Sequence, residues 1–365
     1  MQQLIGQPIS ALDTPALLVD LDALERNIAR GFAALEGTGV TMRPHLKTGK
    51  SPHLARCLLA AGAVGVCVAK LGEAEVMAAA GIDDILITSE LVGEAKLRRL
   101  VALLRDHPRV RLVVDSPQGA AGLSAALEAA GLSAEVLLEV NVGQNRCGVL
   151  PSETLGLAGA VARLPGLRLV GLQGYEGHLQ HGRDREQRRA ACLAAMDALG
   201  GAAEALRRAG HEMRVVSTGG SGTYTFCARH PAVTEVQPGS FAFMDTDYLA
   251  TPGLPFESAL RVSATVISRP APERAVTDAG LKSLSTDSGF AEPFGLSGWA
   301  YRPGGDEHGI LDRASPEAPE LAVGDRLELI PSHIDTTLNL HDFYLLHRGG
   351  VVAEVWPIAA RGKVA

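Results

Sequence analysis

The chain has 365 residues, of which 46% are hydrophobic, 21% charged and 4% aromatic, as expected for a globular protein with one large and one smaller domain. Its 34 Lys and Arg residues against 41 Asp and Glu residues give a formal net charge of −7, which argues against a positive surface for nucleic acid. The longest apolar stretch, residues 57–69, is shorter than the roughly 18 residues of a membrane span, so we expect neither a nucleic-acid nor a membrane partner.

The first residues and the cysteines predict the cellular compartment. The opening Met-Gln-Gln-Leu-Ile-Gly-Gln has neither the basic segment nor the apolar segment of a secretory signal. The 5 cysteines include no C-x-x-C pair and are odd in number, which favours reduced thiols. We therefore expect a cytoplasmic enzyme.

Short β-branched runs alternate with amphipathic helical patterns from about residue 41 to 243, as parallel sheets require. Eight runs are predicted as strands: 41–47, 65–70, 84–90, 111–115, 135–143, 167–175, 214–220 and 233–243. Eight strand–helix units over about 200 residues predict an α/β fold, a (β/α)8 TIM barrel, to which we assign residues 23–255. A doubly wound sheet is the alternative, but no G-x-G-x-x-G follows the first strand.

The helical pattern disappears after about residue 256, and Pro/Gly turns separate short strand-like runs. The predicted strands are 261–268, 274–278, 326–330, 342–347 and 351–356. They predict a C-terminal antiparallel β domain over residues 256–365. The run Leu17–Asp20 is expected to pair with it, so residues 1–22 are assigned to the same domain. Residues 302–320, rich in Pro, Gly and acidic side chains, are predicted to form an exposed loop.

A lysine stands at the end of the first barrel strand, in Arg43-Pro-His-Leu-Lys-Thr-Gly-Lys. The strand period places Arg43, His45 and Lys47 on one face, with Lys47 at the C-terminal mouth where barrel active sites lie. Neighbouring cations would lower the pKa of Lys47, so that its amine could form a Schiff base. A basic strand end that makes surface ion pairs is the alternative interpretation.

One turn of small residues follows the seventh strand, and a second lies within the eighth run. Barrels often bind phosphate at these two places. The candidate phosphate ligands are Thr218, Gly219, Gly220, Ser221 and Ser240. A flexible turn is the alternative for either one alone. Together with Lys47, they indicate a phosphorylated carbonyl cofactor, for which pyridoxal 5′-phosphate (PLP) is the best fit.

Four strings in the chain resemble the alanine-racemase-like (fold type III) PLP enzymes, and especially the D-threonine aldolase/D-serine dehydratase branch. They are Arg43-Pro-His-Leu-Lys-Thr, Ser217-Thr-Gly-Gly, Glu235-Val-Gln-Pro-Gly-Ser and Asp278-Ala-Gly. The resemblance extends from Asp13 to Arg361 and implies a homodimer with Lys47 as the cofactor lysine. It also implies that Arg146 and Tyr175 lie near the pyridoxal ring. Gly49 departs from the pattern, because a histidine is common there.

A possible metal site lies in the string Pro331-Ser-His-Ile-Asp. On an extended segment His333 and Asp335 would project to one face and could bind one cation. A surface pair is the alternative for H-x-D alone, but the resemblance implies that the branch carries its metal here. Dehydratases of the branch look like H-x-C, whose thiolate suits zinc, whereas the oxygen of Asp335 suits Mn²⁺, Mg²⁺ or Co²⁺. This difference favours an aldolase.

A histidine-containing segment follows the sixth strand, in Tyr175-Glu-Gly-His-Leu-Gln-His. The family pattern has a glutamine–histidine pair where Gln180 and His181 stand, so the resemblance implies His181 as the catalytic base. His178 does not match this pattern. His308 lies in another family-like string, but no role follows for it.

The predicted function is PLP- and divalent-metal-dependent cleavage of D-3-hydroxy-amino acids, of the D-threonine type, to glycine and an aldehyde. A D-serine or 3-hydroxy-D-aspartate dehydratase is the nearest alternative, and an amino-acid racemase is a weaker one because it would not need the metal pair. A non-catalytic PLP-binding protein and a metal-binding module without PLP are the alternatives from other classes.

Overall fold

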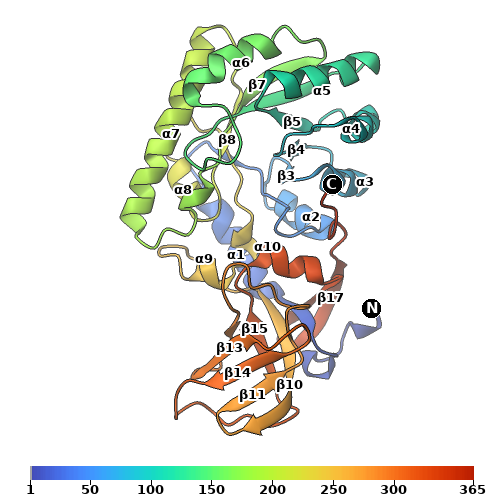
Figure 1. Cartoon of the computed structure of the whole chain (residues 1–365), viewed down its shortest axis with the longest axis vertical. Coiled ribbons are helices and arrows are strands. Elements are labelled where there is room, and N and C mark those ends of the chain that lie inside the picture. The colour runs from blue at the N-terminus through green and yellow to red at the C-terminus, as the bar shows by residue number, and fades with distance from the viewer. Residues whose placement is uncertain (1) are drawn as a thin grey trace. The chain divides into compact units, whose positions relative to one another are not determined.

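The computed structural model describes residues 2–365, and contacts divide these residues into two compact units (Figure 1). Among the described residues, the barrel unit comprises 31–239, 251–253 and 362–365, and the β unit comprises 2–30, 240–250 and 254–361. Within the β unit, the buried Asn27 side chain donates hydrogen bonds to the carbonyls of Ala242 (3.1 Å) and Glu257 (2.8 Å). Asn27 and Ala242 lie in segments that the sequence analysis assigned to the barrel. Their hydrogen bonds join these segments to each other and to Glu257 within the β unit.

The barrel unit contains an eight-stranded parallel sheet in the order β2-β9-β8-β7-β6-β5-β4-β3. The strands are β2 (Thr41–Met42), β3 (Val66–Val68), β4 (Ile85–Ile87), β5 (Arg111–Val114), β6 (Ala134–Glu139), β7 (Leu167–Gln173), β8 (Val215–Thr218) and β9 (Glu235–Val236). A parallel bridge between His45 and Cys67 joins its two ends. Each strand falls within or overlaps one predicted run, and the predicted (β/α)8 fold class is confirmed.

Helices lie around the outside of this sheet (Figure 1). They are α2 (Pro52–Ala60), α3 (Leu71–Ala79), α4 (Glu94–Asp106), α5 (Pro117–Ala129), α6 (Thr154–Val161), α7 (Arg185–Arg208) and the one-turn α8 (Tyr224–Cys227). The Asp184 side chain caps α7 by accepting from the Glu186 and Gln187 amides, and Arg207 and Arg208 lie in its last turn, where cations favour the helix dipole. No helix within residues 2–365 is both long and apolar enough to cross a membrane.

The β unit contains a mostly antiparallel sheet in the order β13-β14-β11-β10-β1-β16-β17, and β15 pairs with both β10 and β12. Its strands are β1 (Ala16–Asp20), β10 (Leu260–Ala271), β11 (Arg274–Thr277), β12 (Glu292–Pro293), β13 (Trp299–Pro303), β14 (Gly309–Arg313), β15 (Arg326–Ile330), β16 (Phe343–Arg348) and β17 (Val351–Pro357). As expected, the N-terminal run belongs to this sheet, because β1 pairs with β10 and β16. The helices of the unit are α1 (Leu21–Ala33), whose last three residues belong to the barrel unit, α9 (Thr246–Leu249) and α10 (Ile334–Thr337).

The prediction of an exposed loop over residues 302–320 is wrong for its first half. Strands β13 and β14 pair there as an antiparallel hairpin, with Tyr301 opposite Leu311. Both side chains are buried, and the Trp299 indole donates to the Pro319 carbonyl at 2.9 Å. Strand β13 buries the side chains of Trp299 and Tyr301, and β14 buries that of Leu311, which is too short an alternation to stand out among prolines and glycines.

Candidate active site

Lys47 lies in the turn after β2, on the side of the barrel where the parallel strands end, which is the reactive side of (β/α)8 enzymes. Its side chain is half-buried, and its amide donates to Nδ1 of His45 at 3.3 Å. Nε2 of His45 lies 2.9 Å from the Thr88 hydroxyl, which fixes the imidazole against β4. The turn therefore presents a primary amine at the mouth of the barrel.

The two cations near Lys47 in the sequence, Arg43 and Lys50, are both paired with carboxylates in the structure. Arg43 is buried and forms ion pairs with Glu235 at 2.9 Å and with Asp84 at 2.6 Å. The Lys50 ammonium forms an ion pair with the buried Glu73 carboxylate. Since each cation has its own carboxylate, neither supplies uncompensated positive charge beside Lys47.

The glycine-rich loop follows β8 directly and is buried from Thr218 to Thr223. Gly219 has a φ of +82°, which other residues rarely adopt. A Cβ at Gly220 would lie 2.5 Å from Oε1 of Gln180, and one at Gly222 would overlap the Gln180 carbonyl. Backbone conformation and close packing therefore require these glycines, which argues against a flexible turn.

The carboxyl of Glu176 beneath this loop is the group that sequence reasoning missed. Glu176 is fully buried, and its Oε2 accepts hydrogen bonds from the Thr218 hydroxyl at 2.9 Å and the Gly219 amide at 3.4 Å. A glutamate within a histidine-containing string carries no sequence signal of this role.

Arg146 and Tyr175 come together in the structure, although they follow different strands. The Arg146 guanidinium lies 5.7 Å from the centre of the Tyr175 ring, within the range of a cation–π contact. Arg146 is exposed and Tyr175 is half-buried. Near them, burial raises the pKa of Glu139 to about 8; its Oε2 accepts from Nε2 of Gln173 at 2.6 Å. Glu139 is therefore mostly protonated at neutral pH.

His178 and His181 lie on the segment between β7 and α7, and both are exposed. His178 is part of a single 3-10 turn, Gly177–Leu179, and His181 follows that turn. Gln180, immediately before His181, is buried. Tyr175 and His181 therefore lie on the same segment between β7 and α7.

Ser240 lies in the β unit, and so does His308. Ser240 begins the 3-10 turn Ser240–Ala242, and its carbonyl accepts from the Met244 amide at 2.9 Å. His308 is exposed between β13 and β14.

The segment with His333 and Asp335 is not extended throughout, so that expectation is wrong. His333 is the extended N-cap residue of α10, with φ −145° and ψ 119°, whereas Asp335 lies inside the helix. The Asp245 carboxylate holds the start of this helix, accepting from the Ile334 amide at 3.1 Å. The two side chains therefore lie around one helix N-terminus instead of on one face of a strand.

A carboxylate orients the His333 ring. Nδ1 of His333 lies 2.7 Å from Oδ2 of Asp287. Although burial opposes ionisation, hydrogen bonds from Ser285, His333 and Thr336 lower the pKa of Asp287 to about 2, so it is ionised and Nδ1 carries the proton. In the neutral ring with the proton on Nδ1, Nε2 is the nitrogen with the lone pair, as in metal-binding histidines whose other nitrogen donates to a carboxylate. Sequence reasoning missed Asp287.

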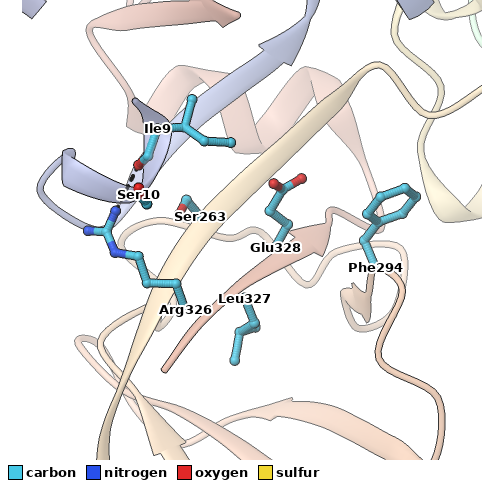
Figure 2. Close-up of a pocket in the computed structure, with 7 residues that line it drawn as sticks. All are labelled: Ile9, Ser10, Ser263, Phe294, Arg326, Leu327 and Glu328. Carbon is cyan, nitrogen blue, oxygen red and sulfur yellow. Dashed lines mark hydrogen bonds between the residues drawn. The ribbon is translucent and has the colours of Figure 1, made fainter. Parts of the chain in front are cut away.

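A pocket of about 280 Å³ lies on the β unit (Figure 2). Its lining residues are Ile9, Ser10, Ser263, Phe294, Arg326, Leu327 and Glu328. Arg326 closes one side by donating to the Ile9 carbonyl at 2.9 Å. None of the predicted site residues lines this pocket.

Two family models match the chain. The model of the alanine racemase N-terminal domain matches residues 19–247, and that of a serine dehydratase domain matches residues 259–347. The matches follow one another along the chain and together include every predicted site residue.

Several characterised proteins are similar over most of their length. D-threonine aldolase of an Arthrobacter species is 42% identical, covering 98% of this chain and 95% of its own length. 3-Hydroxy-D-aspartate aldolase of Paracoccus denitrificans is 38% identical, covering 98% of this chain and 94% of its own length. D-threo-3-hydroxyaspartate dehydratase of Delftia sp. is 35% identical, covering 89% of this chain and 92% of its own length. The crystal structure of D-threonine aldolase from Filomicrobium marinum is 43% identical, with a TM-score of 0.95 over 99% of this chain and 98% of that one.

Proposed function

Because the chain belongs to the D-threonine aldolase/D-serine dehydratase branch of the alanine-racemase-like enzymes, we propose that it cleaves D-3-hydroxy-amino acids to glycine and an aldehyde. The observation that carries this proposal is the 42% identity to a D-threonine aldolase over 98% of the chain. The substrate is a small amino acid, and we propose PLP and a divalent metal as cofactors. The proposal includes a homodimer, as the family resemblance implies, and a cytoplasmic location, which the odd number of cysteines without a C-x-x-C pair favours.

The donor set of the barrel unit fits PLP. Lys47 supplies the amine for the covalent link, and the cation–aromatic pair of Arg146 and Tyr175 supplies contacts for a pyridine ring. Thr218, Gly219, Gly220 and Ser221 would line the phosphate site. Ser240, the fifth predicted phosphate ligand, belongs to the β unit and stays a prediction. When bound, PLP supplies an electron sink for the broken bond.

His181 acts as the general base in this proposal. Its exposed position on the segment that carries Tyr175 leaves the imidazole accessible to a substrate hydroxyl. It would remove the proton of the 3-hydroxyl group, because loss of that proton starts cleavage between the two carbons.

The donors of the β unit fit a hard divalent cation. Nε2 of His333, oriented by Asp287, and a carboxylate oxygen of Asp335 would hold Mn²⁺, Mg²⁺ or Co²⁺. A cation there supplies Lewis acidity, which lowers the pKa of a hydroxyl group. Two protein ligands leave coordination positions for water and substrate.

Chelation tests the metal requirement of the proposed reaction. The holoenzyme is treated with EDTA, and glycine release from D-threonine is measured together with the visible absorbance of the bound cofactor. We expect glycine release to stop while the absorbance persists, and Mn²⁺, Co²⁺ or Mg²⁺ to restore activity. Full activity in metal-free buffer, with no metal found by elemental analysis, would contradict the metal site.

A dehydratase is the second candidate, favoured by the 35% identity to D-threo-3-hydroxyaspartate dehydratase. It would release a keto acid and ammonia from the same substrates. The dehydratases of the branch resemble H-x-C, with a cysteine at the position of Asp335. The carboxylate of Asp335 therefore favours the aldolase.

A further inference from the structure

The segment after β7 is tied to the glycine-rich loop through one buried carboxyl group. Glu176 is 0% exposed, and no ion pair described within residues 2–365 includes it. Besides the Thr218 and Gly219 donors, its Oε1 accepts hydrogen bonds from the Thr223 hydroxyl, from Nε2 of Gln180 at 3.3 Å and from Sγ of Cys227 at 3.5 Å. A carboxylate buried without a cation is stable only when such donors replace water.

Gln180 completes the connection one turn later on the same segment. Its Nε2 donates to the Thr223 hydroxyl at 2.9 Å, and its Oε1 accepts from the Gly222 amide at 2.9 Å. Glu176 and Gln180 together therefore hold both ends of the loop, near Thr218 and near Thr223. The glycines permit this close approach, as the overlap of a Cβ at Gly222 with Gln180 indicates.

The two residues that flank this connection are those assigned to the ring and to the base. Tyr175 immediately precedes Glu176, and His181 immediately follows Gln180. A shift of the loop relative to the segment would therefore displace the phosphate ligands from Tyr175 and His181.

We propose that Glu176 is a positioning residue that fixes the phosphate-binding loop, residues 218–223, on the segment from Tyr175 to His181. The inference rests on the proposed function, since it takes this loop as the phosphate site. Glu176 acts through Thr218, Thr223 and Gly219, which donate to its fully buried carboxyl group. Its effect is thus specific to the phosphate group of PLP and does not extend to the aldehyde or the ring.

Binding of PLP and of pyridoxal, which lacks the phosphate, tests this inference without turnover. Apo-protein is titrated with each compound, and the affinity is measured from the visible absorbance. In Glu176→Gln the side chain keeps its size, but its NH₂ group faces groups that donate hydrogen bonds to the carboxyl oxygens of Glu176. The loop is then held less firmly, so PLP affinity should fall by about 10- to 100-fold. Pyridoxal affinity should stay unchanged. Glu135→Gln, at the opposite end of the barrel strands, is the matched control and should change neither affinity.

Thr223→Val keeps the test decisive if Glu176→Gln does not fold. It removes the hydroxyl that donates to Glu176 and accepts from Gln180 and the Gly220 amide, without adding a charge, so it should also reduce affinity for PLP but not for pyridoxal. Equal losses for the two compounds, or no loss for PLP, would overturn the positioning role. If wild-type apo-protein itself binds PLP no better than pyridoxal, the phosphate site in the proposed function is wrong instead.

Discussion

Removal of Asp287 is expected to weaken the metal site without touching a metal ligand. In Asp287→Ala the His333 ring loses the 2.7 Å bond at Nδ1, so its tautomer and orientation are no longer fixed. Loss of such a partner typically weakens metal binding by about 10- to 100-fold, which corresponds to about 1.4 to 2.8 kcal/mol. Asp287→Asn keeps an acceptor but loses the charge, so we expect a smaller effect.

The assay is a titration of the metal-free holoenzyme with Mn²⁺, in which electron paramagnetic resonance measures the free ion. Glu317→Ala, which removes an exposed carboxylate of the same unit, is the control and should leave the dissociation constant unchanged. A dissociation constant for Asp287→Ala equal to that of the wild type would refute the argument that Asp287 orients His333.

Three further outcomes follow from the barrel unit. Lys47→Ala should abolish both turnover and the cofactor absorbance while the fold is retained; borohydride trapping of the cofactor on Lys50 would contradict the assignment. His181→Ala should slow glycine release by about 10²- to 10⁴-fold with PLP still bound, and the same loss in His178→Ala alone would show that the other histidine is the base. Burial raises the pKa of Glu139 to about 8, so its protonated form stabilises the fold. That contribution is complete below about pH 4.5 and is lost as the pH rises through about 8, by at most about 1.4 kcal/mol per pH unit. Urea unfolding between pH 5 and 8 should show this loss in the wild type and a weaker one in Glu139→Gln; equal slopes would contradict it.

The barrel was predictable because parallel strands buried on both faces are continuous apolar runs rich in Val and Ile, such as Val66–Val68 and Ile85–Ile87. The hairpin of β13 and β14 was not, because its apolar runs, Trp299–Tyr301 and Ile310–Leu311, are only two or three residues long and lie among turn-forming residues. The positions of Arg146 and Tyr175 followed from family resemblance, and the structure shows that they contact each other.

Polar partners distant in sequence explain most of what sequence reasoning missed. Arg43 pairs with Asp84 and Glu235, which lie 41 and 192 positions away, so the local string of cations did not indicate these partners. Likewise, Asp287 is 46 positions from His333. Such pairs follow from the folded topology, and no local period or spacing indicates them.

Product analysis tests the central claim most directly. The metal-reconstituted holoenzyme is incubated separately with D-threonine and L-threonine, and glycine, acetaldehyde, keto acid and ammonia are quantified in each reaction. We expect equal amounts of glycine and acetaldehyde from D-threonine, and neither product from L-threonine. Release of keto acid and ammonia instead of glycine would contradict the aldolase and identify the enzyme as a dehydratase.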